Sequence, residues 1–179
     1  TRLMIKLLNI VFILNLIWPL QLLADTAKPL VLEDSRSSYL LKDYLIVYEG
    51  VDNFNFLNNA EKFVDNQRNL HLDSIDQTQK SLWGYFYIKN NSKKHLNWWI
   101  NFCNNDYVTV RIEGETYETG YLVKGSEKPI VAGSYYVPIT LKSDQVQRVF
   151  FKIEKDFHDF NLNFKIDNEI ERINSLWYK

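Results

Sequence analysis

Cysteine is almost absent from this chain of 179 residues, in which Cys103 is the only one. A single cysteine cannot form a disulfide within the chain, so a packed apolar core must stabilise the fold. The three histidines, His71, His95 and His158, are scattered, and no pair of cysteines or histidines has metal-ligand spacing. The sequence therefore predicts no zinc site and no cofactor, and we expect Cys103 to be a small apolar residue at a strand end.

An excess of charge of one sign is also lacking, because 21 lysines and arginines stand against 22 aspartates and glutamates. Proteins that bind nucleic acids usually carry a basic stripe or patch. The balanced composition therefore argues against a nucleic-acid partner.

Local catalytic motifs are missing as well. The chain has no phosphate-binding glycine loop, no Gly-x-Ser-x-Gly turn and no His-Glu-x-x-His helix. Two carboxylates that meet only in the folded protein could still hydrolyse a glycosidic bond, and this alternative stays open. The acids in predicted loops that could form such a pair are Glu113, Glu115, Glu118, Asp156 and Asp159. Because no motif favours catalysis, we predict a protein that is not an enzyme and has no catalytic residues.

The longest apolar run lies at the amino terminus, over residues 7–23, and contains no charged residue. Lys6 precedes this run, and Ala24 follows it as a small residue at which a peptidase can cut. A basic start, an apolar centre and a small residue at the cleavage position are typical of a secretory signal peptide. We therefore predict that residues 1–24 direct export and that the mature protein is extracytoplasmic.

An uncleaved membrane anchor is the alternative for this amino-terminal run. Pro19 and the asparagines Asn9 and Asn15 lie within the run and weaken a membrane-spanning helix. Met4 is the only methionine, so we expect residues 1–3 to lie upstream of the true start.

After residue 24 about 155 residues follow, which is enough for one domain with its own core. Runs that alternate apolar and polar residues, separated by Asn, Asp and Ser, predict strands joined by turns. About eight such runs occur, at residues 29–33, 39–48, 82–88, 95–102, 107–112, 134–141, 146–154 and 160–166. We predict an all-β fold, an antiparallel β-sandwich of jelly-roll type, over residues 25–167.

Within this sandwich we expect the three runs of residues 81–112 to form a β-meander. Apolar residues at helical spacing predict one short helix over residues 55–63, and residues 65–81 are expected to be a long surface connection. The tail, residues 168–179, has apolar residues at helical spacing and is either a short helix or a linker.

Aromatic residues gather on one side of two of the predicted strands. Alternation places Gly84, Phe86 and Ile88 on the core side of the first strand. If the opposite sides of both strands align, they form a flat aromatic surface of Trp83, Tyr85, Tyr87, Trp99 and Asn101. Flat rings stack on the apolar faces of sugars, and an amide supplies hydrogen bonds, so we predict a ligand-binding surface for carbohydrate. Two alternatives are that both sheet faces are buried, and that a ligand binds on loops at the sandwich edge.

The order of several motifs resembles a known family. A Tyr-Leu-Leu-Lys-Asp-Tyr segment at residues 39–44 precedes the tryptophan strand 82–92, which ends in Asn before a polar turn. A strand pair within 98–112, a Thr-Gly turn at 119–123, a Lys-Pro segment at 128–130 and strands at 135–141 and 148–153 follow in sequence. This pattern resembles the second class of extracellular domain of bacterial seven-transmembrane receptors with diverse intracellular signalling modules.

The resemblance implies a periplasmic jelly-roll domain, similar to carbohydrate-binding modules, that senses a small-molecule or carbohydrate ligand. It further implies a membrane partner, reached through a membrane region that would follow Lys179, and it leaves a homodimer open. The chain departs from the family at Tyr85, where members often have a basic residue. A free periplasmic binding or adhesion protein is the alternative to a receptor domain.

Overall fold

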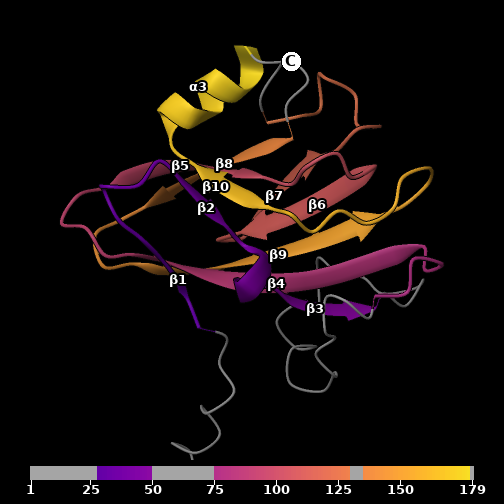
Figure 1. Ribbon diagram of the computed structural model, residues 1–179, viewed down its shortest axis with the longest axis horizontal. Helices are drawn as coiled ribbons and strands as arrows, with labels where there is room; N and C mark the ends of the chain where they lie inside the picture. Colours follow the sequence, from indigo (N-terminus) through magenta and orange to yellow (C-terminus); the bar gives the residue numbers. More distant parts are fainter. Residues whose placement is uncertain (1–27, 50–74, 130–134, 178–179) are drawn as a thin grey trace, which may run out of the picture.

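The computed structural model describes residues 28–49, 75–129 and 135–177, and in this part of the chain two β-sheets pack face to face (Figure 1). The six-stranded sheet consists of β1 (Leu30–Leu32), β3 (Ile46–Glu49), β4 (Ser81–Asn90), β6 (Tyr107–Ile112), β7 (Glu115–Thr119) and β9 (Val146–Glu154). The four-stranded sheet consists of β2 (Ser38–Leu40), β5 (Leu96–Asn101), β8 (Tyr136–Leu141) and β10 (Lys165–Asp167). The predicted signal peptide and the predicted helix over 55–63 lie outside the described residues.

The chain crosses repeatedly from one sheet to the other. The strand order is β1-β4-β9-β6-β7 in the larger sheet, with β3 also paired to β4, and β2-β10-β5-β8 in the smaller sheet. Consecutive strands such as β4 and β5, β5 and β6, or β8 and β9 therefore lie in opposite sheets. β1 runs parallel to β4, and the other described pairs are antiparallel. This confirms the prediction of an all-β sandwich.

A single apolar core fills the space between the sheets. Alternation along β4 sends Leu82, Phe86 and Ile88 into this core, and β9 contributes Phe151 to the same layer. The ring of Phe164, which is fully buried, packs edge-on against Phe151 at 5.1 Å between ring centroids. The fold thus has the continuous apolar interior that a chain without disulfides requires.

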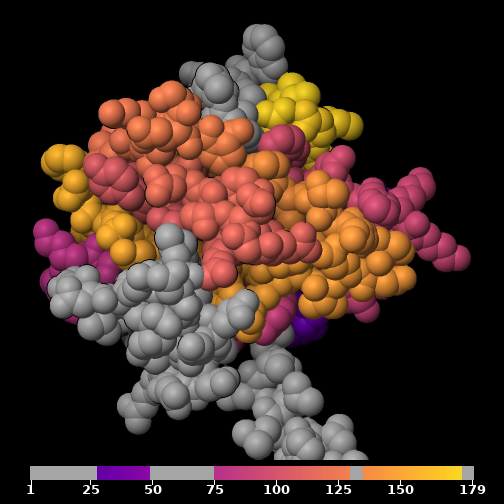
Figure 2. Space-filling model, turned by 180° about the vertical axis from the view of Figure 1, so that it is seen from behind, coloured from indigo at the N-terminus to yellow at the C-terminus, as the bar shows by residue number. Residues whose placement is uncertain are grey.

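A short helix, α3 (Glu169–Trp177), follows the last strand and confirms the helical alternative for the tail. It lies over the outer face of the four-stranded sheet, in contact with β5 and β10 (Figure 1). Figure 2 shows the molecule from behind, where the coral residues around β6 and β7 face the viewer and α3, in yellow, lies at the upper rim.

The predicted β-meander is wrong, although its three strands are present. β4 and β6 both pair with β9 in the larger sheet, whereas β5 belongs to the smaller one. The side-chain amide of the buried Asn90 donates hydrogen bonds to the carbonyl oxygens of Lys94 and Lys142, at 2.7 and 2.9 Å. These bonds fix the connection at the point where the chain leaves β4 and crosses to the opposite sheet.

Three other strand predictions need correction. Residues 39–48 form two strands in different sheets, separated by a 3-10 turn over Lys42–Tyr44. Only the end of the predicted strand 160–166 pairs with other strands. Before that point side chains bind the backbone instead of a neighbouring strand, as where Asn105 Oδ1 accepts a hydrogen bond from the Asn161 N–H at 2.8 Å. β7 was not predicted, since its sequence is almost entirely polar and three of its five residues are exposed.

Gly84 permits a close approach of β3 to β4. A Cβ built at this position would meet the backbone oxygen of Ile46 and would lie 2.7 Å from Cζ of Phe151. Both neighbours belong to the packed interior and have no room to shift, so only glycine fits.

We expect Gly84→Ala to destabilise the domain by about 1–3 kcal/mol, because the added methyl group overpacks the contact between β3 and β4. The free energy of unfolding in urea measures this loss. Gly125→Ala is the matched control, because its Cβ would have no neighbour within 4 Å. Equal stability of the two variants would contradict the proposed close packing.

Candidate functional site: a cavity beside Trp99

The predicted aromatic surface is divided between two opposite sides of the molecule. Trp83, Tyr85 and Tyr87 lie on the outer face of the six-stranded sheet, as the alternation of β4 predicts. Trp99 and Asn101 lie on the outer face of the four-stranded sheet. Because β4 and β5 belong to different sheets, the structure does not bring the five side chains together.

The outer face of the six-stranded sheet forms its own buried cluster. Trp83 is only 2% exposed, and the ring of Tyr48 stacks on it with 4.5 Å between ring centroids. Tyr85 is also buried, and this burial raises the pKa of its hydroxyl above the ordinary value. Tyr87 is the more accessible member, at the edge of the cluster near Arg148. Trp83 and Tyr85 therefore present little ring surface to a ligand. For this sheet face, the structure agrees with the alternative in which the aromatic side chains are buried.

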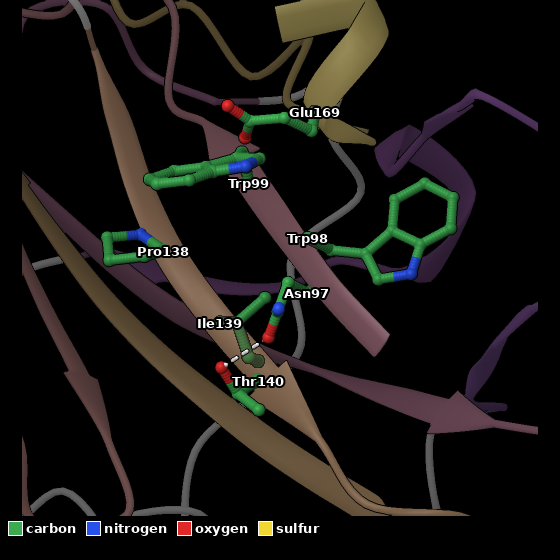
Figure 3. Close-up of a pocket in the computed structure, with 7 residues that line it drawn as sticks. All are labelled: Asn97, Trp98, Trp99, Pro138, Ile139, Thr140 and Glu169. Carbon is green, nitrogen blue, oxygen red and sulfur yellow. Dashed lines mark hydrogen bonds between the residues drawn. The ribbon is translucent and has the colours of Figure 1, made fainter. Parts of the chain in front are cut away.

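The outer face of the four-stranded sheet contains a cavity of about 350 Å³ (Figure 3). Its lining is formed by Asn97, Trp98, Trp99, Pro138, Ile139, Thr140 and Glu169. The side chain of Trp98 points away from the cavity, into the core, whereas that of Trp99 borders it (Figure 3). The cavity thus combines residues of β5 and β8 with the first residue of α3.

The indole of Trp99 is held between the sheet and the helix. Pro138 is the residue opposite Trp99 in the β5–β8 pairing, and Glu169 lies on the other side of the ring (Figure 3). The guanidinium carbon of Arg172 lies 4.4 Å from the centroid of the indole. The buried Nε1 of Trp99 completes no hydrogen bond of ordinary geometry, but it lies close enough to the Glu169 carboxylate to help lower the pKa of that group. Glu169 is therefore the nearest acceptor for the indole N–H in the cavity wall.

The remaining polar groups of the cavity come from two sources. Across the β5–β8 pair, the hydroxyl of Thr140 donates to Oδ1 of Asn97 at 2.9 Å (Figure 3). On α3, Arg172 donates two hydrogen bonds to Glu169, from Nε at 3.2 Å and from Nη2 at 2.5 Å. These bonds lower the pKa of Glu169, and partial burial opposes the shift. An amide, a hydroxyl and an ionised carboxylate thus surround an aromatic ring.

Two junction residues place α3 over Trp99. The carboxylate of the buried Asp167 accepts hydrogen bonds from Ser38 Oγ at 2.5 Å and from Tyr136 Oη at 2.9 Å. The next residue, Asn168, caps the helix, since its Oδ1 accepts from the Glu171 N–H at 2.9 Å. The backbone of Asn168 also donates to the carbonyl of Ser37 at 2.8 Å. The helix therefore begins at a fixed position on the sheet.

Of the site residues predicted from the sequence, only Trp99 lines this cavity, and Asn101 lies on the same outer sheet face outside the lining. Asn97 and Thr140 come from strands far apart in sequence, so only the pairing of β5 with β8 reveals that they meet. Glu169 and Arg172 carried a usable signal, because an Asn followed by an acidic first turn marks a helix start. That signal locates the helix but not the surface against which it packs.

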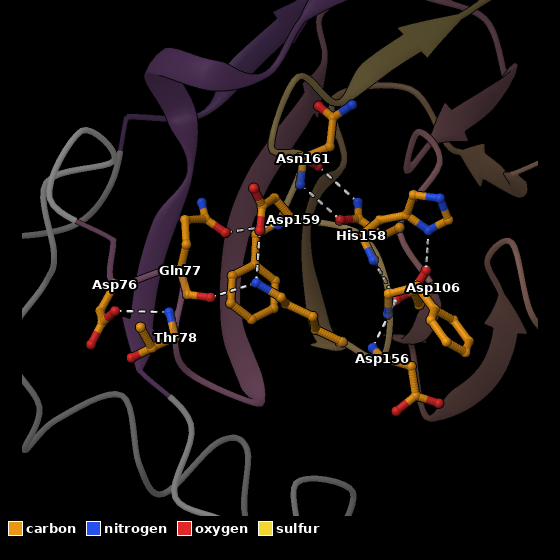
Figure 4. A network of polar contacts seen from close by, with 12 residues as sticks. Asp76, Gln77, Thr78, Asp106, Asp156, His158, Asp159 and Asn161 are labelled. Atoms are coloured by element: carbon orange, nitrogen blue, oxygen red, sulfur yellow. Dashed lines mark hydrogen bonds and ion pairs between the residues drawn. The ribbon is translucent and has the colours of Figure 1, made fainter.

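A second polar cluster surrounds Asp106, whose side chain is fully buried (Figure 4). Its Oδ2 accepts hydrogen bonds from the backbone N–H groups of Asp156, Phe157 and His158, at 2.6–3.0 Å. His158 Nδ1 lies 2.5 Å from Oδ1. Burial alone would raise the pKa of Asp106, but these hydrogen bonds outweigh it and hold the pKa well below the ordinary value. All these partners serve to fix the 155–159 turn.

Two of the five acids considered for a catalytic pair are engaged by other side chains in the structure. Asp159 forms an ion pair with Lys155 at 2.7 Å, and Glu113 accepts a hydrogen bond from Gln145. No group of three acidic, histidine or cysteine side chains in the described residues has the arrangement of a metal site. Cys103 lies just after the end of β5, close to the predicted strand end, but it is partly exposed in a turn with φ of 59°, and its Sγ donates to the Asn163 carbonyl, so it does not serve as an apolar filler.

We expect Asp106→Asn to lower the free energy of unfolding by about 1.5–3 kcal/mol, because a charged acceptor of several hydrogen bonds is lost. The pH dependence gives a second test. The depressed pKa of Asp106 means that its contribution is complete above the ordinary carboxyl pKa of about 4 and is lost as the pH falls further.

Urea unfolding at pH 7 and at acid pH measures both effects. The difference in stability between the parent and Asp106→Asn should shrink as the pH falls below about 4. A difference that stays constant over this range would show that the carboxylate charge does not stabilise the turn.

Comparison with known proteins supports the fold but shows no family. No protein-family model matches the chain, and no curated protein matches it. Among solved structures, a β-glucuronidase from Ruminococcus gnavus is similar with a TM-score of 0.50 and 11% sequence identity, over 79% of this chain and 29% of the enzyme. The apo structure of the enzyme from the same organism gives a TM-score of 0.49 with 10% identity, over 79% of this chain and 30% of the enzyme.

The insecticidal crystal protein Cry2Aa is more distant, with a TM-score of 0.34 and 12% identity over 52% of this chain and 16% of that protein. The chain thus spans less than a third of the length of the structures it matches. At such low identity, the likeness to the glucuronidase concerns the fold alone. It supports the β-sandwich fold of the described residues.

Proposed function

We propose that this domain binds carbohydrate without turning it over, and that the cavity beside Trp99 is the binding site. The observation that carries the proposal is the combination of a flat indole with an amide, a hydroxyl and a carboxylate in one cavity of about 350 Å³. A pyranose presents an apolar face of C–H groups and a rim of hydroxyls. It therefore needs both an aromatic ring and polar groups at the ring edge.

The size and lining of the cavity fit this ligand class. Sites for small molecules usually have volumes of about 300–1,000 Å³, mostly apolar walls and few polar groups. The Trp99 cavity is at the lower end of this range and has the same kind of lining. The Nε1 of Trp99, which makes no hydrogen bond of ordinary geometry, can donate to a sugar oxygen once the ring edge becomes accessible.

A sensing role in a membrane receptor is the wider proposal. It rests on the motif order that resembles the extracellular domains of seven-transmembrane receptors, and on the amino-terminal run that resembles a signal peptide. None of the helices in the described residues is long and apolar enough to cross a membrane. The structurally similar β-glucuronidase is, by its name, a carbohydrate-active protein, and this supports the ligand class.

Glycoside hydrolysis is the competing activity. It usually requires two carboxylates on either side of the scissile bond. The described lining of the Trp99 cavity contains one, Glu169, and this carboxylate is engaged by Arg172. Binding without catalysis is therefore the function that the site favours.

We expect Trp99→Ala to weaken carbohydrate binding at least about tenfold, because the stacking surface is lost. The measurement is titration of the chain by NMR or calorimetry with methyl β-D-glucopyranoside, methyl β-D-glucuronide and cellobiose. Circular dichroism checks the fold of the variant, and Trp99→Phe retains a smaller ring if the alanine variant does not fold.

Tyr87→Leu is the matched control, because Tyr87 lies on the opposite outer face and belongs to the other part of the predicted aromatic surface. Its affinity should equal that of the parent. Loss of binding in Tyr87→Leu with full binding in Trp99→Ala would move the site to the six-stranded sheet. Absence of binding by the parent across all three sugars would count against the ligand class.

A further inference from the structure

We propose that Arg172 and Glu169 form a displaceable latch that couples the occupancy of the Trp99 cavity to the position of α3. A ligand that stacks on the indole takes the place of the Arg172 guanidinium, and the helix beyond its first residues is released from the sheet. This inference rests on the proposed function, since the same cavity must bind the ligand.

Only one face of the Trp99 ring is open to a stacking ligand. One side of the Trp99 ring lies toward Pro138 of the neighbouring strand (Figure 3). The guanidinium of Arg172 lies over the ring at 4.4 Å, and its partner Glu169 is on the side away from Pro138 (Figure 3). The ring surface that a sugar would use is thus the one that the protein's own cation covers.

The contacts of the latch are weak enough to exchange. One cation–π contact and one ion pair within a helix turn are each modest in strength, and neither holds a helix in place by itself. The side chain of Glu169 is 51% exposed and that of Arg172 is 14% exposed, so the guanidinium gains full contact with water only when it leaves the ring. A stacked sugar that gains a similar ring contact can therefore compete with Arg172.

The side of α3 that contacts the sheet is polar over its first turn. Glu169 lines the cavity and Arg172 lies over the Trp99 ring, whereas the apolar side chains of Ile170 and Ile173 are 68% and 41% exposed. Because these two side chains bury little apolar surface, they oppose movement of the helix only weakly. The helix start is different, because the Asn168 cap and the Asp167 hydrogen bonds fix it. Displacement is then a pivot of α3 about its first residue.

Removal of the latch should affect binding in the direction opposite to removal of a ligand contact. If the Trp99 ring is uncovered in only part of the molecules, the measured affinity for a sugar is lower than the affinity of the uncovered site. Removing the Arg172 guanidinium uncovers the ring in every molecule and so raises the measured affinity. From the weak cation–π contact we expect Arg172→Ala to tighten binding of the sugar that binds best among the three probes, by about 3- to 10-fold.

Arg148→Ala is the matched control. Its guanidinium makes the same kind of contact, 4.6 Å from the ring centroid of Phe150, but on the opposite sheet. Its affinity for the sugar should equal that of the parent. Glu169→Gln, which removes the partner charge while keeping the side-chain shape, should shift the affinity in the same direction as Arg172→Ala and by a smaller factor.

Hydrogen exchange of the α3 amides tests the latch without any ligand. Arg172→Ala should exchange faster than the parent throughout α3, and the parent saturated with the sugar should approach the exchange of the variant. Exchange in β5 and β10 should stay unchanged, because the sheet does not move.

The outcomes separate the two proposals. Weaker sugar binding by Arg172→Ala would make Arg172 a ligand contact, which overturns the latch and leaves the binding function intact. Unchanged affinity and unchanged exchange would overturn the latch as well. If faster α3 exchange in the variant were accompanied by no binding of any sugar, the proposed function would fail, and with it the coupling to a ligand.

Discussion

The structure depends on the burial of two apolar sheet faces against each other. The chain has a single cysteine, so no disulfide constrains the unfolded state, and hydrophobic burial must supply most of the stabilisation. Phe86, Phe102 and Phe151 are fully buried between the sheets and set their separation. The outer faces are then free to differ: one buries a cluster of aromatic rings, and the other supports a helix with a cavity beneath it.

Polar groups determine how that helix is placed. Asp167 accepts hydrogen bonds from β2, which is adjacent to β10, and from β8, which lies beyond β5, and therefore ties the end of β10 to both sides of the sheet. Asn168 begins the helix directly afterwards, and Arg172 meets the indole one turn later. The last residue of β10, the helix cap and the residue that contacts the Trp99 ring thus lie in one short stretch of the chain. The apolar side chains Ile170 and Ile173 in this stretch face outward.

The sequence predicted what depends on local periodicity. The strand at 146–154 and the side of β5 that carries Trp99 follow from alternation, which needs no knowledge of the partner strands. Sheet membership was not predictable in this way, because β4 pairs with β9 more than fifty residues later in the chain. The cavity depends on such long-range pairing and on the docking of α3. For that reason its wall residues other than Trp99, such as Thr140 and Glu169, were not found from the sequence.

The position of Pro138 has one more consequence. β8 is the last strand of the four-stranded sheet, and an edge strand offers unpaired backbone groups to any other extended chain. Proline has no backbone N–H and so cannot complete a ladder of hydrogen bonds along that edge. The residue that supports the Trp99 ring therefore also makes β8 a poor template for further strands. Replacing Pro138 by a residue with a backbone N–H would therefore alter the cavity wall and also favour aggregation at this edge.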